Sequence, residues 1–568
     1  MAEVLQGQAI AIVETKPSRN DYVDLFENSF EFDQFQLCSN PSVKRVLKRD
    51  VDIEFNPDDY DWVILVGSEP LKFYTKEGSI TEYSGRIVDD KFLPVINPAM
   101  LAFKPEAKKT WEESRDNVFK YLNGEMKQEK LENIYGITES ADLYVFLTRA
   151  LEHENDFVAL DSETSALYPR DGHMLGISMS YEPEHGAYID CNCIDEKAEE
   201  LLQLIFDKKR VVFHNAKFDM AFFEYHFGFK FPRFEDTMLM HYTLNENPGT
   251  HGLKQLALKF TPFGDYEKPM YDWIEAFRKR NGLLKQDFSW DMIPYEVMKD
   301  YAAMDAVVTL TLFHKFKKAL DTNDRLTWVY RNILLPGCRF LCDIETNGVP
   351  FDTDRLKRSS TLMAEQIDEA VSKLNSYPEV QQFIKDRGEF NPNSTVQLRS
   401  LLFDYIGLEP TGKKTGTGAD STDAEVLGQL GEQHEIPKLI LEVRQNVKIK
   451  NTYLDKILPA LDLDGRLRTG FNLHGTTSGR LSSSGKLNMQ QIPRDNPIVK
   501  GCIKAKEGHQ IVAMDLTTAE VYCAAVLAKD ENLMDVFRQG GNFHSTIAKQ
   551  VFKLPCEVEE VAELYGDK

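Results

Sequence analysis

Between residues 156 and 320 the sequence changes from short apolar runs typical of strands to longer segments with helical spacing. This order predicts a sheet formed by the first part of the region and packed helices formed by the second. With 568 residues, the chain is too long for one hydrophobic core, so several domains are expected. We therefore predict a multidomain α/β protein.

Two carboxylates end the first strand-like run of this region, FVALDSET. Asp161 and Glu163 lie two residues apart, and side chains at this spacing on a strand project from the same face. Unpaired carboxylates that share a face repel each other unless a cation lies between them. The pair indicates a metal site, although such pairs are also common at solvated strand ends.

Two helical segments add polar side chains at a spacing of four residues. Asn215 and Asp219 follow a strand-like run, and Tyr301 and Asp305 lie within an extended helical pattern. Residues four apart on a helix share one face. Each pair alone is ambiguous, because Asn215 is also a natural helix N-cap, Tyr301 also fits a core aromatic and Asp305 also fits a solvated charge.

In order and separation, Asp161, Glu163, Asp219, Tyr301 and Asp305 together resemble the Tyr subclass of the Asp-Glu-Asp-Asp exonucleases. The resemblance implies a ribonuclease H-like fold and a 3'–5' exonuclease that acts on single-stranded DNA 3' ends. It also implies that the four acidic residues hold two Mg²⁺ ions, or Mn²⁺ in their place, at the scissile phosphate. Tyr301 would orient the attacking water.

The net charge of −23 argues against a protein that coats nucleic acids without specificity. Within this acidic chain, however, residues 466–506 contain eight Lys and Arg side chains and a single acid, Asp495. Such a local excess predicts a surface that contacts the phosphates of a nucleic acid.

Two segments of the second half resemble motifs of the DNA polymerase I-like (family A) DNA polymerases. Residues 474–495 (HGTTSGRLSSSGKLNMQQIPRD) resemble a template–primer binding signature, and residues 511–530 (IVAMDLTTAEVYCAAVLAKD) resemble polymerase motif A, in which a buried apolar strand ends at Asp515. The four residues between Asp515 and Glu520 depart from the usual motif. These departures are more similar to the polymerases of large tailed phages than to the bacterial repair enzyme.

The family A resemblance implies roles for several residues and two kinds of partner, a DNA primer–template and deoxynucleoside triphosphates. Asp515 would bind the catalytic metal ions, while Glu520 and His544 would contact the incoming nucleotide. The implied DNA contacts are Asn215 in the exonuclease and Arg444, Lys448, Lys450, Arg480, Asn488, Gln490 and Arg494 in the polymerase region.

Two parts that the family needs for nucleotidyl transfer do not occur in the sequence: a second palm carboxylate and the fingers helix that binds the triphosphate. We therefore expect either a second polymerase chain that carries the fingers and the rest of the palm, or a truncation, and we favour the naturally split polymerase. A partial palm would expose apolar faces around residues 513–516 and 523–528, which a partner would cover.

The first 125 residues mix short apolar runs with turn residues, which predicts a small α/β domain. Two turns, Gly67-Ser68-Glu69-Pro70 and Asn97-Pro98, resemble loops of the family 4-type uracil-DNA glycosylases. Because the cysteines of an iron–sulfur cluster are missing, we expect a degenerate, non-catalytic module. The predicted domains are the N-terminal α/β module (1–130), the exonuclease (131–325), the palm entry and helical thumb (326–460) and a partial palm with motif A (461–568).

The eight cysteines form no CxxC pair, which predicts reduced thiols in a cytoplasm, that of the host cell for a viral protein; a metal pair of Cys191 and Cys193 is the alternative. The sequence contains no apolar run of 18 residues, so no membrane span is predicted.

There are two competing functions. One is a stand-alone 3'–5' exonuclease with a vestigial polymerase remnant, and the other is a non-catalytic DNA-binding scaffold subunit. The complete acidic set disfavours the scaffold, and Asp515, Glu520 and Arg480 disfavour the remnant.

Overall fold

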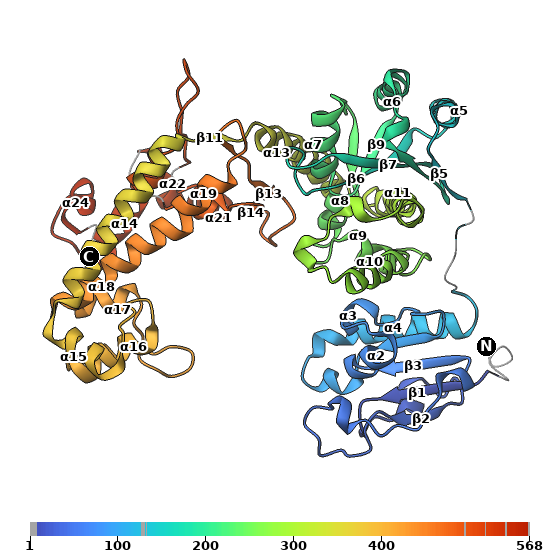
Figure 1. Cartoon of the computed structure of the whole chain (residues 1–568), viewed down its shortest axis with the longest axis horizontal. Coiled ribbons are helices and arrows are strands. Elements are labelled where there is room, and N and C mark those ends of the chain that lie inside the picture. Colours follow the sequence, from blue (N-terminus) through green and yellow to red (C-terminus); the bar gives the residue numbers. More distant parts are fainter. Residues whose placement is uncertain are drawn as a thin grey trace. The chain divides into compact units, whose positions relative to one another are not determined.

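The computed structural model describes residues 8–126, 131, 133–493, 496–516, 518–539 and 542–565. The chain divides into two compact units, Met1–Cys502 and Ile503–Lys568, and each is described by itself (Figure 1). Several layered α/β and helical regions make up the first unit, which confirms the prediction of a multidomain α/β protein. No helix in the described ranges is long and apolar enough to cross a membrane.

The first region of the large unit is a four-stranded parallel sheet with the strand order β2-β1-β3-β4. Both of its faces are apolar, as expected for parallel strands covered on two sides: Ile12 and Ile64 pack with Trp111 on one face, and Val13 and Leu65 pack on the other. Its strands are β1 (Ile10–Glu14), β2 (Asp33–Gln36), β3 (Trp62–Val66) and β4 (Phe92–Val95), and its helices are α1 (Tyr22–Leu25), α2 (Ser68–Thr75), α3 (Ile80–Tyr83) and α4 (Lys108–Leu122).

A six-stranded mixed sheet with the order β10-β9-β6-β7-β8-β5 forms the next region. β6 and β7 pair antiparallel, as do β7 and β8, while β6 runs parallel to β9. The strands are β5 (Ile134–Ile137), β6 (Phe157–Thr164), β7 (Met174–Glu182), β8 (His185–Asp190), β9 (Arg210–Phe213) and β10 (Phe234–Asp236). The helices are α5 (Ser140–Glu152), α6 (Glu196–Lys208), α7 (Ala216–His226), α8 (Thr237–Leu244), α9 (Leu253–Phe260), α10 (Lys268–Asn281) and α11 (Tyr295–Leu320).

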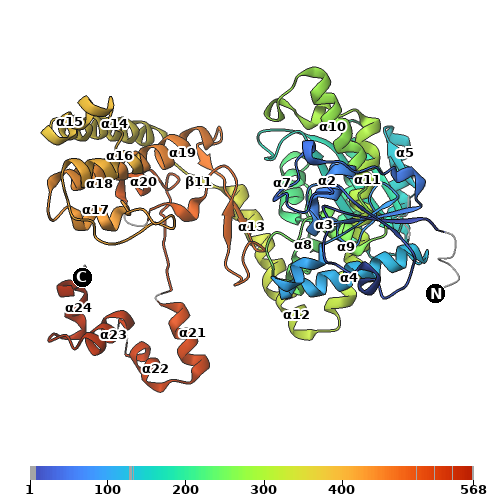
Figure 2. The same ribbon diagram turned by 90° about the horizontal axis from the view of Figure 1, so that it is seen from below.

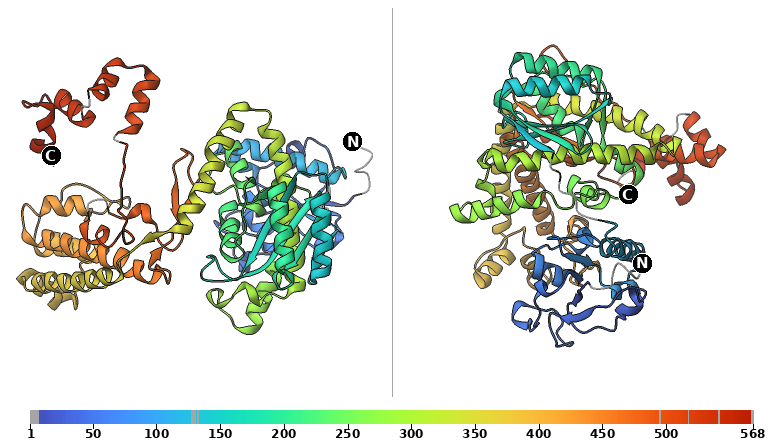
Figure 3. Two further views of the ribbon diagram at one scale, coloured as in Figure 1. Left: turned by 90° about the horizontal axis from the view of Figure 1, so that it is seen from above. Right: turned by 90° about the vertical axis from the view of Figure 1, so that its right-hand side faces the viewer.

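The long helix α11 crosses the six-stranded sheet and places one part of the candidate site (Figure 3). It contacts β5, β6, β7 and β8 along one side, and α8 and α9 along another. Residues 302–310 are buried without interruption, because a helix enclosed on several sides cannot present a polar face to water. The expected order of sheet before helices holds for β6 to β8 and α8 to α11, whereas α6 and α7 lie between strands.

A buried carboxylate of β10 ties the six-stranded sheet to the helical segment at residues 330–331. Glu235 is fully buried; its Oε1 accepts hydrogen bonds from Arg210 (3.0 Å) and Arg331 (2.6 Å), and its Oε2 accepts one from the Tyr330 hydroxyl (2.8 Å). Removing one partner of a buried ion pair leaves the others without compensation.

We expect Glu235→Gln to lower the free energy of unfolding by about 2 kcal/mol, less than for a fully enclosed pair because both arginines are about one-third exposed. Urea unfolding followed by circular dichroism measures the loss. Glu200→Gln, at an exposed position of α6, is the control, and equal stability of the two variants would contradict the expectation.

Helices dominate the rest of the large unit, and α14 lies beside α18 around a core that includes Leu374, Phe383 and Ile440 (Figure 2). The helices are α12 (Asp324–Val329), α13 (Leu335–Asn347), α14 (Thr353–Asn375), α15 (Pro378–Arg387), α16 (Thr395–Arg399), α17 (Ala424–Leu430), α18 (Glu435–Lys448), α19 (Asp455–Ala460) and α20 (Pro497–Lys500). The short strands are β11 (Val349–Pro350), β12 (Arg466–Leu467), β13 (Gly470–Asn472) and β14 (Ser482–Ser484).

Gly348 turns the chain from α13 into β11. Its φ is +64°, a conformation that favours glycine, and an added Cβ would lie 2.7 Å from Arg468 Cγ and 3.0 Å from the Leu467 carbonyl oxygen. The antiparallel pair β11–β12 therefore depends on the absence of a side chain at this position.

The small unit contains α21 (Ala519–Ala528), α22 (Glu531–Arg538), α23 (Phe543–Phe552) and α24 (Val561–Tyr565). The expectation of a buried strand ending at Asp515 is wrong, because residues 509–516 form no strand and Met514 and Leu516 are 92% and 82% exposed. A strand is stable only when a neighbour pairs with it, and no strand in the described residues does so here.

Candidate active site

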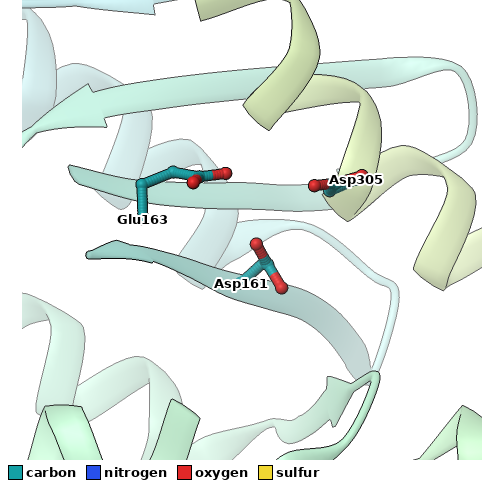
Figure 4. Close-up of side chains that lie close together, drawn as sticks. All are labelled: Asp161, Glu163 and Asp305. Carbon is teal, nitrogen blue, oxygen red and sulfur yellow. The ribbon is translucent and has the colours of Figure 1, made fainter. Parts of the chain in front are cut away.

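Three carboxylates from two elements converge beside the C-terminal half of β6 (Figure 4). Asp161 and Glu163 come from β6, and Asp305 comes from α11. One oxygen of each lies within 4.8 Å of an oxygen of the others. The period of two on the strand and the packing of α11 on the sheet account for this convergence. Among the described residues this is the only such group of three, and it includes neither Cys191 nor Cys193.

The electrostatics of the three carboxylates fit a site for divalent cations. Burial raises the pKa of Asp161, Glu163 and Asp305 well above the ordinary values, and the neighbouring carboxylates raise it further. Glu163 Oε1 is buried and has no hydrogen-bond partner. An oxygen of this kind loses its hydration without compensation unless a cation binds it. The donor set, composed of oxygens only, suits Mg²⁺ or Mn²⁺.

Asp219, the fourth acidic residue of the predicted set, lies on α7 and is only 1% exposed. Its Oδ1 accepts hydrogen bonds from the backbone N–H (3.0 Å) and the hydroxyl (2.7 Å) of Ser162, the residue between Asp161 and Glu163. Burial raises the pKa of Asp219 to about 8, against the lowering effect of Ser162. Asp219 thus lies against β6 but outside the group of three.

Asn215 precedes α7 in a left-handed conformation, with φ of +68°, and its side chain makes no capping hydrogen bond. The turn is held by Asp236, whose Oδ2 accepts from the Ala216 N–H (2.9 Å) and whose Oδ1 accepts from the Leu239 N–H (3.1 Å). A non-glycine residue in this conformation costs free energy and is often found at functional sites. Asn215 thus stands at the N-cap position of α7, but its side chain does not cap the helix.

Tyr301 lies beside Asp305, and burial together with this carboxylate raises the pKa of Tyr301. A second tyrosine, Tyr266, was missed by the sequence analysis. Its hydroxyl donates a hydrogen bond to Asp305 Oδ1, and its ring stacks on Tyr301 with centroids 6.4 Å apart. Glu267 next to it is 8% exposed, and burial raises its pKa to about 7. Both lie in a loop between α9 and α10, where no periodic spacing signals them.

The predicted DNA-contacting residues of the thumb differ in whether other groups of the protein already bind their charged ends. Arg444 donates to the carbonyl oxygens of Pro392 (2.8 Å) and Thr422 (2.9 Å), so its guanidinium braces two loops. Lys450 pairs with Asp455 at 2.6 Å. Lys448 is exposed at the end of α18.

Three predicted contacts of the template–primer signature lie in or after the β13–β14 hairpin. Arg480 is exposed in its loop. Asn488 Oδ1 accepts from the Gln490 N–H at 3.0 Å, and Gln490 Nε2 donates to the Leu481 carbonyl at 3.1 Å, so these two side chains shape the loop itself. Arg494 lies outside the described residues.

In the small unit, Asp515, Glu520 and His544 are all exposed. Asp515 precedes α21, Glu520 lies in its first turn, and His544 lies in the first turn of α23. These three predicted residues form no common cluster of metal ligands in the part of the chain that the structure describes.

Two parts of the chain match known protein families. Residues 134–321 match the 3'-5' exonuclease family, and residues 354–563 match DNA polymerase family A. The chain is 44% identical over 582 residues to the DNA polymerase of Escherichia phage T5, covering 98% of this chain and 68% of that protein. It is 30% identical to DNA polymerase I of Pseudomonas aeruginosa over 71% of this chain and 44% of that protein.

Among solved structures, the POL domain of Pol1 from M. smegmatis, in a complex with DNA primer-template and dNTP, superposes with a TM-score of 0.58. Its sequence identity is 25%, covering 75% of this chain and 68% of that chain. The two family matches define the class, a 3'-5' exonuclease domain joined to a polymerase domain. The chain belongs to the family A DNA polymerases and carries their 3'-5' exonuclease domain.

Proposed function

We propose that this chain removes nucleotides from single-stranded 3' ends of DNA during phage DNA replication in the host cytoplasm. The observation that carries the proposal is the convergence of the Asp161, Glu163 and Asp305 carboxylates around an unpartnered Glu163 oxygen, in a chain with an exonuclease domain. Three neighbouring carboxylates, two of them buried, repel one another when ionised, so a divalent cation between them would be favourable, which suits phosphodiester hydrolysis.

In this proposal Asp161, Glu163, Asp219 and Asp305 hold two Mg²⁺ or Mn²⁺ ions. When bound, such ions supply the charge that activates a water and stabilises the leaving 3' oxygen. Tyr301, beside Asp305, orients the attacking water through its hydroxyl. Ser162 holds Asp219 through two hydrogen bonds and so keeps that carboxylate near the pair on β6.

A cavity of about 220 Å³ beside Asn215 supports the assignment of a DNA strand as substrate. Phe218 and Tyr225 of α7 line it, together with Tyr168 and with Lys486, which also pairs with Asp171 and Asp462. Aromatic rings stack on bases without regard to sequence, and cations bind the backbone. We propose that the cavity and Asn215 receive the unpaired 3' end.

The second half of the chain is proposed to contribute to template-directed nucleotidyl transfer. Asp515 would bind metal, Glu520 and His544 would contact the deoxynucleoside triphosphate, and the primer–template would lie along the thumb and the basic segment 466–506. The implied DNA contacts there remain Arg444, Lys448, Lys450, Arg480, Asn488, Gln490 and Arg494.

For nucleotidyl transfer we propose that a second polymerase chain supplies the fingers and the remaining palm. The exposed apolar side chains of Met514, Leu516 and Leu527 support the proposal that another polypeptide segment covers them.

We further propose the domain boundaries 1–130, 131–325, 326–460 and 461–568. The first domain is proposed to be a degenerate, non-catalytic relative of uracil-DNA glycosylases.

A 5'-labelled primer–template with a mismatched 3' end, incubated with the purified chain, Mg²⁺ and all four deoxynucleoside triphosphates, tests the proposal. We expect stepwise shortening of the primer without extension, and no shortening in EDTA. Extension would contradict the expectation that the polymerase site is incomplete. An unchanged primer would contradict the exonuclease.

A further inference from the structure

We propose that the N-terminal module is a positioning element of the exonuclease site, and that it acts through the loop that holds Tyr266 against Asp305. The module is defined as residues 8–126. The inference rests on the proposed exonuclease function and gives the module a role that requires no chemistry of its own.

Tyr266 is placed to fix the orientation of a metal-binding carboxylate. Its hydroxyl donates to Asp305 Oδ1, and its ring stacks on Tyr301 at an angle of 22°. Because Oδ1 is engaged in this way, the carboxylate cannot rotate freely with respect to Asp161 and Glu163. Partners that orient metal ligands are known to govern both metal affinity and activity.

The loop that carries Tyr266 is anchored on both sides by the N-terminal module. Asp265, the preceding residue, accepts a hydrogen bond through Oδ2 from the hydroxyl of Tyr83 at 2.8 Å. Lys268, two residues after Tyr266, pairs with Asp89 at 2.6 Å. Tyr83 and Asp89 both belong to the module, so two of its side chains hold a segment of only four residues.

Further contacts make this junction a packed interface. Leu258 of α9 is 7% exposed and belongs to the same apolar cluster as Leu71 and Tyr83 of the module. Gln255 Nε2 donates to Glu82 Oε1 at 3.1 Å. A backbone turn, in which the Lys268 N–H donates to the Asp265 carbonyl oxygen at 3.3 Å, encloses Tyr266, and the contacts with the module add two anchors to this turn.

The direct test is Tyr266→Phe in the full chain, which removes only the hydroxyl. We expect the affinity for Mn²⁺, measured by titration calorimetry at the exonuclease site, to fall about 10-fold, with a parallel loss of excision rate. Thermal unfolding of the variant verifies that the fold is retained. Unchanged Mn²⁺ affinity and an unchanged rate would overturn the role of Tyr266.

The role of the module is tested by Tyr83→Phe and, at the second anchor, Lys268→Met. Each is expected to weaken Mn²⁺ binding in the same direction by about 3-fold. The matched control is Tyr60→Phe, whose hydroxyl donates to Asp33 within the module at 2.8 Å and does not reach the exonuclease. If both anchor variants bind Mn²⁺ as Tyr60→Phe does, the inference is wrong; if the unmodified chain neither binds Mn²⁺ nor excises, the proposed function itself fails.

Discussion

Asp161→Ala is expected to lower the rate of 3' excision by at least about 1000-fold, because in the proposed function Asp161 binds the metal ions whose charge stabilises the transition state. The affinity for a single-stranded oligonucleotide is expected to remain near that of the unmodified chain, since phosphate contacts and stacking supply most of that binding. Single-turnover excision and fluorescence anisotropy measure the two quantities separately.

Glu154→Ala, at an exposed carboxylate shortly before β6, is the matched control and should leave both quantities unchanged. If Asp161→Ala instead abolished oligonucleotide binding while its excision defect followed from that loss alone, the carboxylate group would be structural. A variant that excised at the normal rate would remove Asp161 from the site.

The second large effect concerns stability and pH. The pKa values of Asp161, Glu163 and Asp305 are raised well above their ordinary range, and that of Asp219 is raised to about 8, chiefly by burial. Between the unfolded pKa of about 4 and these raised values, the folded protein binds more protons than the unfolded chain. Without metal, the contribution of these four carboxyl groups to stability is therefore fully present below about pH 4 and is lost as the pH rises towards 8.

A single carboxyl group whose pKa is raised to about 8 corresponds to a decrease of order 5 kcal/mol in the free energy of unfolding across this pH range, or to a Tm lower by about 10 °C. Calorimetric scans in EDTA from pH 5 to pH 8 should follow this decline, and saturating Mg²⁺, which binds the ionised forms, should remove it. Asp219→Asn should make the decline in EDTA smaller, while the other three carboxyl groups keep part of it. A Tm that rises with pH in EDTA would contradict the assignment of raised pKa values.

Simple periodicity predicted the part of the site that regular elements position. Asp161 and Glu163 share a strand face, and Asp305 lies on a helix long enough to be recognised, so their faces could be predicted before their distances. Their meeting required the packing of α11 on β6, which no local pattern specifies. The strand order of both sheets was likewise not predictable, because register and crossovers depend on contacts distant in sequence.

The failures have a common physical cause in long-range contacts. Tyr266 reaches Asp305 from an irregular loop, where spacing carries no information about direction. Arg444 donates to two backbone carbonyl oxygens from other loops, contacts that its helical spacing does not predict. The apolar run before Asp515 has strand propensity, but propensity alone does not form a strand without a neighbour that pairs with it.

Lys217 lies between Asn215 and Asp219 on α7, and its ammonium group donates to both Glu345 and the carbonyl oxygen of Phe471 in β13. Glu345 Oε1 in turn accepts from the Phe471 N–H at 2.7 Å. The helix that carries exonuclease residues is thereby joined to the hairpin that carries the template–primer signature. The two segments are therefore mechanically coupled: a change at Lys217, or an insertion in the hairpin, is expected to disturb both the helix and the hairpin at once.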